Sequence, residues 1–293
     1  MKNNKIIICV LILFSLVTTP LLYYISDNPG LIQGKLIHNS MLNKPGGKSK
    51  VIYDLNVPLD NHLISRMKIY EAKTKEIEEQ EIKHYVKVLK LNFSDIKEDV
   101  SAYRIQNDHY QLIVDKNTGL IQYKDLEINI EDNNKKINPE EAIEIFKAFA
   151  EKLNLPLNYR KCLVEDIPDK KLYQLRFINS IEGILNYGYC TKAELSHKGE
   201  ILNFNYYQLV YKPRQIVSIK TKKEAYEDLL KIPFEEEAHI DIQKIELVYF
   251  TQDIEKKNRE KFEDEFILIP CYRFFGEISK NKSFEYFIPA LKE

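Results

Sequence analysis

The sequence contains no tryptophan, and only nine glycines, eleven prolines, four cysteines and three methionines occur among its 293 residues. So few glycines and prolines exclude a collagen-like or low-complexity chain, while 19 tyrosines and 14 phenylalanines exclude intrinsic disorder. An excess of one charge is also missing, because 43 basic residues face 44 acidic ones. A nucleic-acid-binding protein needs a basic surface, so we expect no nucleic-acid partner.

Catalytic motifs are missing as well. The sequence has no G-x-S-x-G, no H-E-x-x-H, no P-loop and no dinucleotide fingerprint. Two Glu–His pairs at i, i+3 occur, Glu81 with His84 and Glu236 with His239. Such pairs bind metal only where four helices converge, and this sequence is rich in strands, so we interpret them as surface residues. We therefore predict a non-enzyme with no catalytic residue, no metal and no cofactor.

The cysteines outside the N-terminal region give no zinc pattern. Cys162, Cys190 and Cys271 are odd in number and form no C-x-x-C pair. In an oxidising compartment Cys162 and Cys190 could form a disulfide; the alternative is that they are buried free thiols.

A long hydrophobic run stands at the N-terminus. Residues 6–25 carry no charge and lie between Lys5 and Asp27. A helix of that length spans about 30 Å, the thickness of the hydrocarbon core of a bilayer. A cleaved signal peptide is the alternative, but its apolar region is shorter and ends at small residues. We therefore expect a retained signal anchor at 6–25.

Charge predicts how this anchor is oriented. Lys2 and Lys5 precede it, so residues 1–5 form a cytoplasmic stub and the bulk of the chain is extracytoplasmic, in a single-pass cell-membrane protein. One face of the anchor combines small hydroxyl residues with leucine and is predicted to bind a partner helix: Leu11, Ser15, Thr18, Thr19 and Leu22. Alternatively, the hydroxyls bond to carbonyls of their own helix.

The exported part is predicted to be α+β, with repeated modules of one helix packed on an antiparallel sheet. Residues 26–50 form a connector that is rich in glycine and proline. An N-terminal extracytoplasmic α+β module follows at 51–130, then a central PepSY-like module at 137–212 and a C-terminal α+β module at 213–293.

The helix starts carry this prediction. Asn138, Pro139 and Glu141 form a capping-box start for a helix over 139–153. Thr221 and Glu224 repeat the arrangement further on. Period-two segments such as 173–177, 185–189 and 202–210 predict strands. Pro270 within a strand predicts an edge or a bulge.

Tyrosines on these strands allow two interpretations. Aromatic residues at period two usually pack in a core or in cross-strand pairs. Tyrosine is also enriched at recognition surfaces, and Tyr207 and Tyr211 are candidates for external contacts.

Three C-terminal segments resemble the YycH/YycI family of membrane-anchored regulators, the YycI branch most closely: Ile245–Phe250 (IELVYF), Leu268–Phe274 (LIPCYRF) and Phe284–Ala290 (FEYFIPA). The two capped helix starts are similar to those of PepSY-like units. Tyr272 stands where this family often has Trp, and Pro289 where it usually has Asn.

The resemblance implies regulation. Members of this family contact the sensor histidine kinase WalK (YycG) of a two-component system for cell-wall homeostasis, through transmembrane and external contacts, and a sister YycH-like protein is a further expected partner. The alternative is an exported PepSY-type binding or inhibitory module that acts on a peptidase or envelope enzyme.

Overall fold

The structure, a computed structural model, describes residues 51–59, 64–127, 136–232, 238–251, 266–278 and 282–292. The predicted stub, anchor and connector lie outside these residues, and so do the anchor contacts Leu11, Ser15, Thr18, Thr19 and Leu22. Within the described ranges, no helix combines the length and the apolar character needed to cross a bilayer.

Three α-helices occur in the described part of the chain: α3 (Glu79–Val88), α4 (Pro139–Lys152) and α5 (Lys222–Leu229). The predicted starts of α4 and α5 are confirmed. The Asn138 side chain accepts from the Glu141 amide at 2.8 Å, and the Glu141 carboxylate accepts from the Asn138 amide at 2.8 Å. Thr221 and Glu224 make the same reciprocal bonds at α5.

Fourteen strands form one sheet. In chain order they are β1 (Val51–Leu55), β2 (Arg66–Thr74), β3 (Ile96–Glu98), β4 (Ala102–Gln106), β5 (Tyr110–Asp115), β6 (Leu120–Asp125), β7 (Lys161–Ile167), β8 (Leu172–Ile181), β9 (Ile184–Ser196), β10 (Ile201–Tyr207), β11 (Leu209–Ser218), β12 (Ala238–Thr251), β13 (Phe266–Ile278) and β14 (Lys282–Pro289). The main path runs β11-β2-β13-β12-β9-β10-β6-β5-β4-β3, with β1 added on β12, β14 on β13, and β7 and β8 beside β9.

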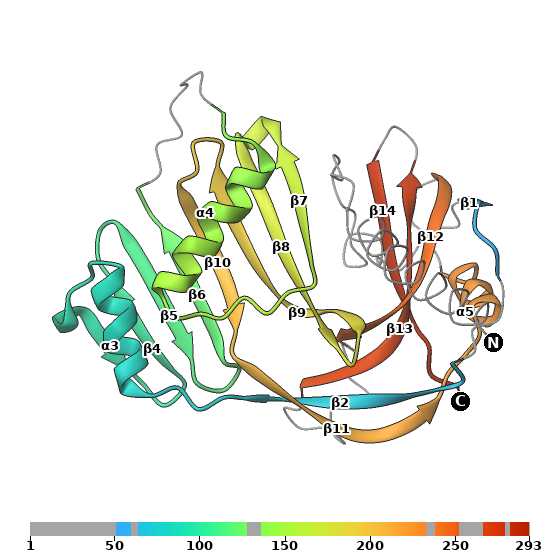
Figure 1. Cartoon of the computed structure of the whole chain (residues 1–293), viewed down its shortest axis with the longest axis horizontal. Helices are drawn as coiled ribbons and strands as arrows, with labels where there is room; N and C mark the ends of the chain where they lie inside the picture. The colour runs from blue at the N-terminus through green and yellow to red at the C-terminus, as the bar shows by residue number, and fades with distance from the viewer. Residues whose placement is uncertain are drawn as a thin grey trace, which may run out of the picture.

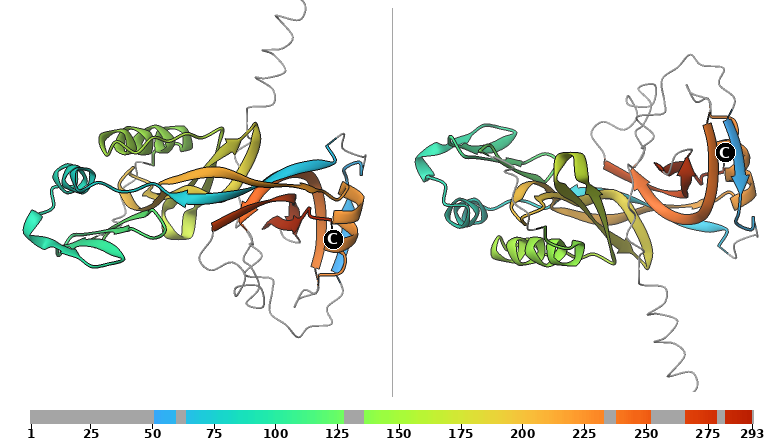
Figure 2. Two further views of the ribbon diagram at one scale, coloured as in Figure 1. Left: turned by 90° about the horizontal axis from the view of Figure 1, so that it is seen from below. Right: turned by 90° about the horizontal axis from the view of Figure 1, so that it is seen from above.

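Strands β3–β10 with α3 and α4 make up what we call the first lobe (Figure 1). Both helices lie on the same side of its strands (Figure 2). Their apolar stripes and alternate strand residues form one core, which includes Val86, Phe146, Leu112, Leu175 and Phe204. Period-two alternation points the intervening residues to the other face of these strands, which is largely polar over β3–β6 and β10.

Strands β1, β2 and β11–β14 with α5 make up the second lobe (Figure 1). One face of β12–β14 packs with α5 in a core that includes Ala225, Leu229, Tyr272 and Phe284. The opposite face contributes to a third core shared with the first lobe: Ile69, Val248, Ile267, Ile269, Cys271 and Phe287 pack with Leu163, Ile178 and Tyr187 of β7–β9.

Two strands carry the chain between the lobes. β2 leads into the first lobe and β11 leads back, and they pair antiparallel from Arg66↔Ser218 to Thr74↔Leu209. The Lys75 amide donates to the Gln208 carbonyl at 2.9 Å, just beyond this ladder. The sheet is also continuous between the lobes through the parallel pair Tyr249↔Asn186 of β12 and β9.

The prediction of repeated modules, each with one helix on its own antiparallel sheet, is wrong. All described strands belong to one mixed sheet, and β1 and β9 pair parallel with β12. Strands from the three predicted ranges pair with one another, as β2 does with β11 and β13. Local periodicity identifies strands but contains no information about distant partners, so it suggested separate sheets.

Candidate functional site

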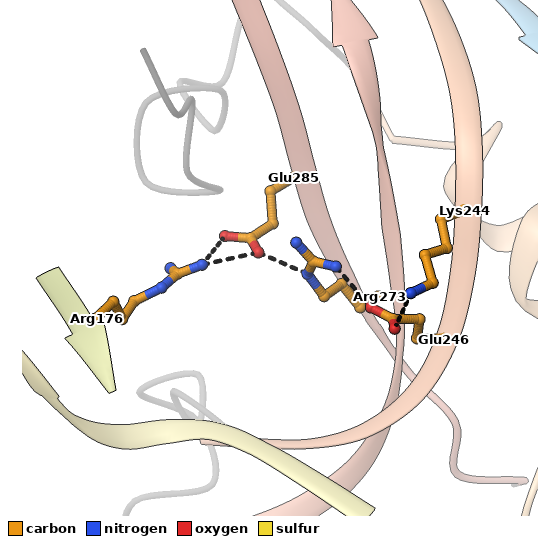
Figure 3. A network of polar contacts seen from close by, with 5 residues as sticks. All are labelled: Arg176, Lys244, Glu246, Arg273 and Glu285. Atoms are coloured by element: carbon orange, nitrogen blue, oxygen red, sulfur yellow. Dashed lines mark hydrogen bonds and ion pairs between the residues drawn. The ribbon is translucent and has the colours of Figure 1, made fainter. Parts of the chain in front are cut away.

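Charged side chains cluster where the two lobes meet. We call this cluster, made of Arg176, Lys244, Glu246, Arg273 and Glu285, the interlobe ion network (Figure 3). Arg176 comes from β8 of the first lobe, and the other four come from β12, β13 and β14 of the second. Glu246 and Arg273 are direct cross-strand partners, which places their side chains on the same face of the sheet.

Glu285 is the centre of the network. Its two carboxylate oxygens each accept from Nη2 of Arg176 at 3.0 Å, and its Oε1 also accepts from Nε of Arg273 at 2.6 Å. Arg273 donates through Nη1 to Oε2 of Glu246 at 2.6 Å. The Nζ of Lys244 lies 2.6 Å from the other Glu246 oxygen. Glu285 thus joins a first-lobe strand to the second lobe by charge-assisted hydrogen bonds.

Water is excluded from the middle of this network. The side chains of Glu285 and Arg273 are 0% and 1% exposed, and that of Arg176 is 10% exposed. The Tyr187 ring covers both guanidinium groups, at 4.7 Å from Cζ of Arg273 and 5.5 Å from Cζ of Arg176. A further ring, Phe275, lies 4.5 Å from Cζ of Arg273. Stacking on aromatic faces compensates part of the desolvation of these cations.

The surroundings set the protonation of the network. Burial acts to raise the pKa of Glu246, but the charges of Arg273 and Lys244 and the hydrogen bond from Lys244 outweigh it and hold that pKa below its ordinary value. Nearby on β7, Lys161 has its pKa lowered to about 8, first by burial and then by the charge of Arg273. The Glu246 carboxylate therefore stays ionised between Arg273 and Lys244.

This arrangement suits coupling between the lobes. A general acid or base needs access to a substrate, and the side chain of Glu285, at the centre of the network, is 0% exposed. Among the described residues, no group of three or more His, Cys, Asp or Glu side chains could hold a metal ion.

Glu81 and His84 have different partners in the structure. Glu81 accepts from Nε2 of Gln208 at 3.0 Å, whereas His84 contacts the Lys152 carbonyl at 2.9 Å. His239 pairs with Asp54, and its predicted neighbour Glu236 lies outside the described residues.

The three described cysteines are free thiols, two of them buried and Cys162 half-buried. The alternative of a Cys162–Cys190 disulfide is therefore absent from this structure. Burial raises the pKa of the Cys162 thiol to about 12.

Tyr207 and Tyr211, the predicted external contacts, are both half-buried. The Tyr207 ring packs edge-on against Tyr189 at 5.4 Å. Tyr211 packs against the core of the second lobe, and burial raises its pKa while hydrogen bonds to Asn179 and Asn186 act to lower it. Their role in binding a partner stays a prediction.

Sequence reasoning missed the interlobe ion network. The available signal was a single charge inside an apolar, aromatic strand: Glu285 between Phe284 and Tyr286, and Arg273 between Tyr272 and Phe274. Charged residues are almost never fully buried unless they are paired, so such isolated charges of opposite sign predict buried ion partners.

Comparisons with solved structures give partial likenesses. The chain is similar to the C-terminal domain of YpeB from Bacillus megaterium, with a TM-score of 0.46 and 17% sequence identity over 74% of this chain and 95% of that one. It is also similar to YycH from Bacillus subtilis, with a TM-score of 0.42 and 12% identity. This second likeness covers 74% of this chain and 52% of the YycH chain, so the chain spans about half the length of that protein. A scan against protein-family models finds no match, and neither does a search of curated proteins.

Proposed function

We propose that the chain is a non-catalytic regulatory protein that is attached to the cytoplasmic membrane, with its folded body outside the cytoplasm. The single observation that carries this proposal is the uncharged stretch at residues 6–25, which is bounded by Lys5 and Asp27. A stretch of 20 apolar residues is long enough to span a bilayer, and the two lysines before it place the N-terminus in the cytoplasm.

The finer proposal is that the partner is a two-component sensor histidine kinase of cell-wall homeostasis, which the chain binds through residues 6–25 and through external contacts. The resemblance of the C-terminal segments to the YycH/YycI family supports this choice of partner.

An exchange of residues 6–25 for an unrelated membrane span tests the proposal. The exchange should abolish co-purification with the kinase and alter phosphorylation of its response regulator, measured in cells that express the exchanged chain. A finer variant, S15A/T18V/T19V, removes the three hydroxyls and should weaken co-purification. The control variant, L13I/V17I, changes residues on the opposite side of the same helical projection and should leave co-purification unchanged.

Two outcomes would count against the proposal. If kinase output is the same with the native stretch, with the exchanged stretch and after deletion of the gene, the kinase is not the target. If the native chain co-purifies instead with a peptidase or another envelope enzyme, the PepSY-type inhibitory role replaces the kinase role.

A further inference from the structure

One face of the first-lobe sheet is left uncovered by α3 and α4. The residues that pack toward these helices alternate along each strand, as Ile105, Leu112, Ile121, Ala193 and Phe204 do. The intervening residues therefore point to the opposite face. Both helices lie on one side of these strands, and no described helix of the first lobe lies on the other (Figure 2).

A row of directly opposed residues crosses this face. The pairing registers place one residue from each of seven strands in the row: Lys97, Arg104, Ile113, Gln122, Asn205, Lys192 and Arg176. We call this set the cation row. Adjacent strands lie about 4.8 Å apart, so the row extends over about 29 Å.

The row has four positive charges and no acidic residue, although the whole chain is almost neutral. Arg176 is neutralised by Glu285, and Nε of Arg104 lies 3.4 Å from Asp99. Lys97 and Lys192 are exposed. Neither has an ion-pair partner among the described residues.

The middle of the row is made of amides. The side chains of Gln122 and Asn205 form no hydrogen bond with another described residue, so their donors and acceptors remain available for a ligand. The neighbouring row differs, because Glu194 there accepts from Gln174 at 3.1 Å and from Asn203 at 2.5 Å.

We infer that the cation row binds an extended acidic segment of a partner protein. Two lysines at separate strands attract carboxylates, and the free amides between them match the hydrogen-bonding groups of a peptide backbone. Lys97 and Lys192 are five strand spacings apart, about 24 Å, and about seven extended residues at about 3.3 Å each span that distance. An anionic lipid surface is a poorer match, because the row has little apolar surface to insert into a membrane: Ile113 is its only apolar member.

This inference goes beyond the proposed function, because it concerns the face of the first-lobe sheet that α3 and α4 leave uncovered, and it holds whether or not the partner is a kinase. The test uses the full-length chain in neutral detergent and a fluorescein-labelled ten-residue peptide of alternating Glu and Thr, with binding followed by anisotropy. The variant K97Q/K192Q should weaken binding at least about fivefold, as expected for two exposed ion pairs. Raising the salt concentration should weaken binding further.

A matched control removes two lysines from the covered side of the same lobe. Lys87 on α3 and Lys152 on α4 are exposed, and K87Q/K152Q should bind the peptide within twofold of the native chain. The same peptide with Gln in place of every Glu should bind at least fivefold more weakly than the acidic peptide.

Three results would overturn the inference. In the first, K97Q/K192Q binds the acidic peptide as the native chain does; in the second, the helix control loses as much affinity. In the third, the native chain ignores the peptide but binds phosphatidylglycerol vesicles in a way that depends on Lys97 and Lys192, and the face is then a lipid-binding surface. None of these results bears on the kinase proposal, which the exchange of residues 6–25 tests by itself.

Discussion

Replacing Glu285 by glutamine should destabilise the protein strongly while changing its shape very little. Glu285 is 0% exposed and is the carboxylate that holds Arg176 of the first lobe. The variant E285Q removes the charge and keeps the side-chain size. Arg273 retains its contact with Glu246 at 2.6 Å, but Arg176 loses its ion partner while its side chain remains only 10% exposed.

The burial of Glu285 and Arg176 determines how much free energy of unfolding E285Q should lose. Removing one member of a buried ion pair typically costs about 3–5 kcal/mol, because the other charge is left without compensation. Glutamine still accepts one hydrogen bond, which places E285Q near the lower end, at about 3 kcal/mol. Domains are stable by only about 5–15 kcal/mol, so the loss is a large fraction of the total.

Urea unfolding followed by far-UV circular dichroism measures this loss; tryptophan fluorescence is excluded because the chain has no tryptophan. The variant R176M should cost less than E285Q, because Glu285 keeps its bond from Arg273. The double variant R176M/E285Q has no orphaned Arg176 charge. It should therefore be at least about 1 kcal/mol more stable than the sum of the single effects predicts. If E285Q costs less than about 1 kcal/mol, or if the two effects simply add, the network does not couple the lobes as described.

Four further predictions concern single features. G276A should destabilise by about 2–4 kcal/mol in urea unfolding, because its Cβ would lie 1.8 Å from the Asp241 carbonyl oxygen. In the control G183A, the added Cβ has no atom within 4 Å, so the variant should lose only about 1 kcal/mol through the strain of its positive φ. Equal losses of stability in G276A and G183A would contradict this prediction. N138A should cost about 1 kcal/mol through loss of the α4 cap, and no change in urea midpoint would show that the cap is dispensable. The pKa of Lys161 is about 8 in the folded chain and near 10.5 in the unfolded one. Between pH 8 and pH 10.5 the unfolded chain therefore binds more protons than the folded one. The free energy of unfolding should rise with pH across this range because of Lys161. Unfolding titrations of K161M should show a smaller rise and higher stability at pH 7. The Cys162 thiol has a pKa of about 12 in the native protein. It should therefore react with iodoacetamide at pH 8 at least about a hundredfold more slowly in the native protein than in urea. Mass spectrometry measures the two rates, and equal rates would mean that the thiol is exposed.

Local features of the fold could be predicted from the sequence because they depend on neighbouring residues. The capping boxes at Asn138 and Thr221 involve residues three positions apart, and both helices begin where those residues indicate. Strand pairing depends on residues far apart in the chain, so it could not be predicted in this way. Pro270 shows the difference. Proline within a strand favours an edge or a bulge, yet Pro270 lies within a central strand, where the neighbour of β13 changes from β2 at Leu268 to β14 at Cys271.

The candidate site was harder to predict than the fold. Arg176 and Glu285 are 109 positions apart and belong to different lobes, so no spacing rule connects them. A charged residue between aromatic neighbours in a strand indicates that a partner is needed, but not which one. The cation row could not be predicted for the same reason. Its members lie side by side only because of the pairing registers of seven strands.

The pairing of β2 with β11 has a consequence for how this architecture could have arisen. Thr74 and Leu209 are cross-strand partners, so the chain leaves and re-enters the second lobe at adjacent points. The first lobe is therefore an insertion into the second lobe. If a short hairpin turn joined β2 directly to β11, the ladder between them would be unbroken. The second lobe would keep α5, its strands β11–β14 and its N-terminal strands β1 and β2.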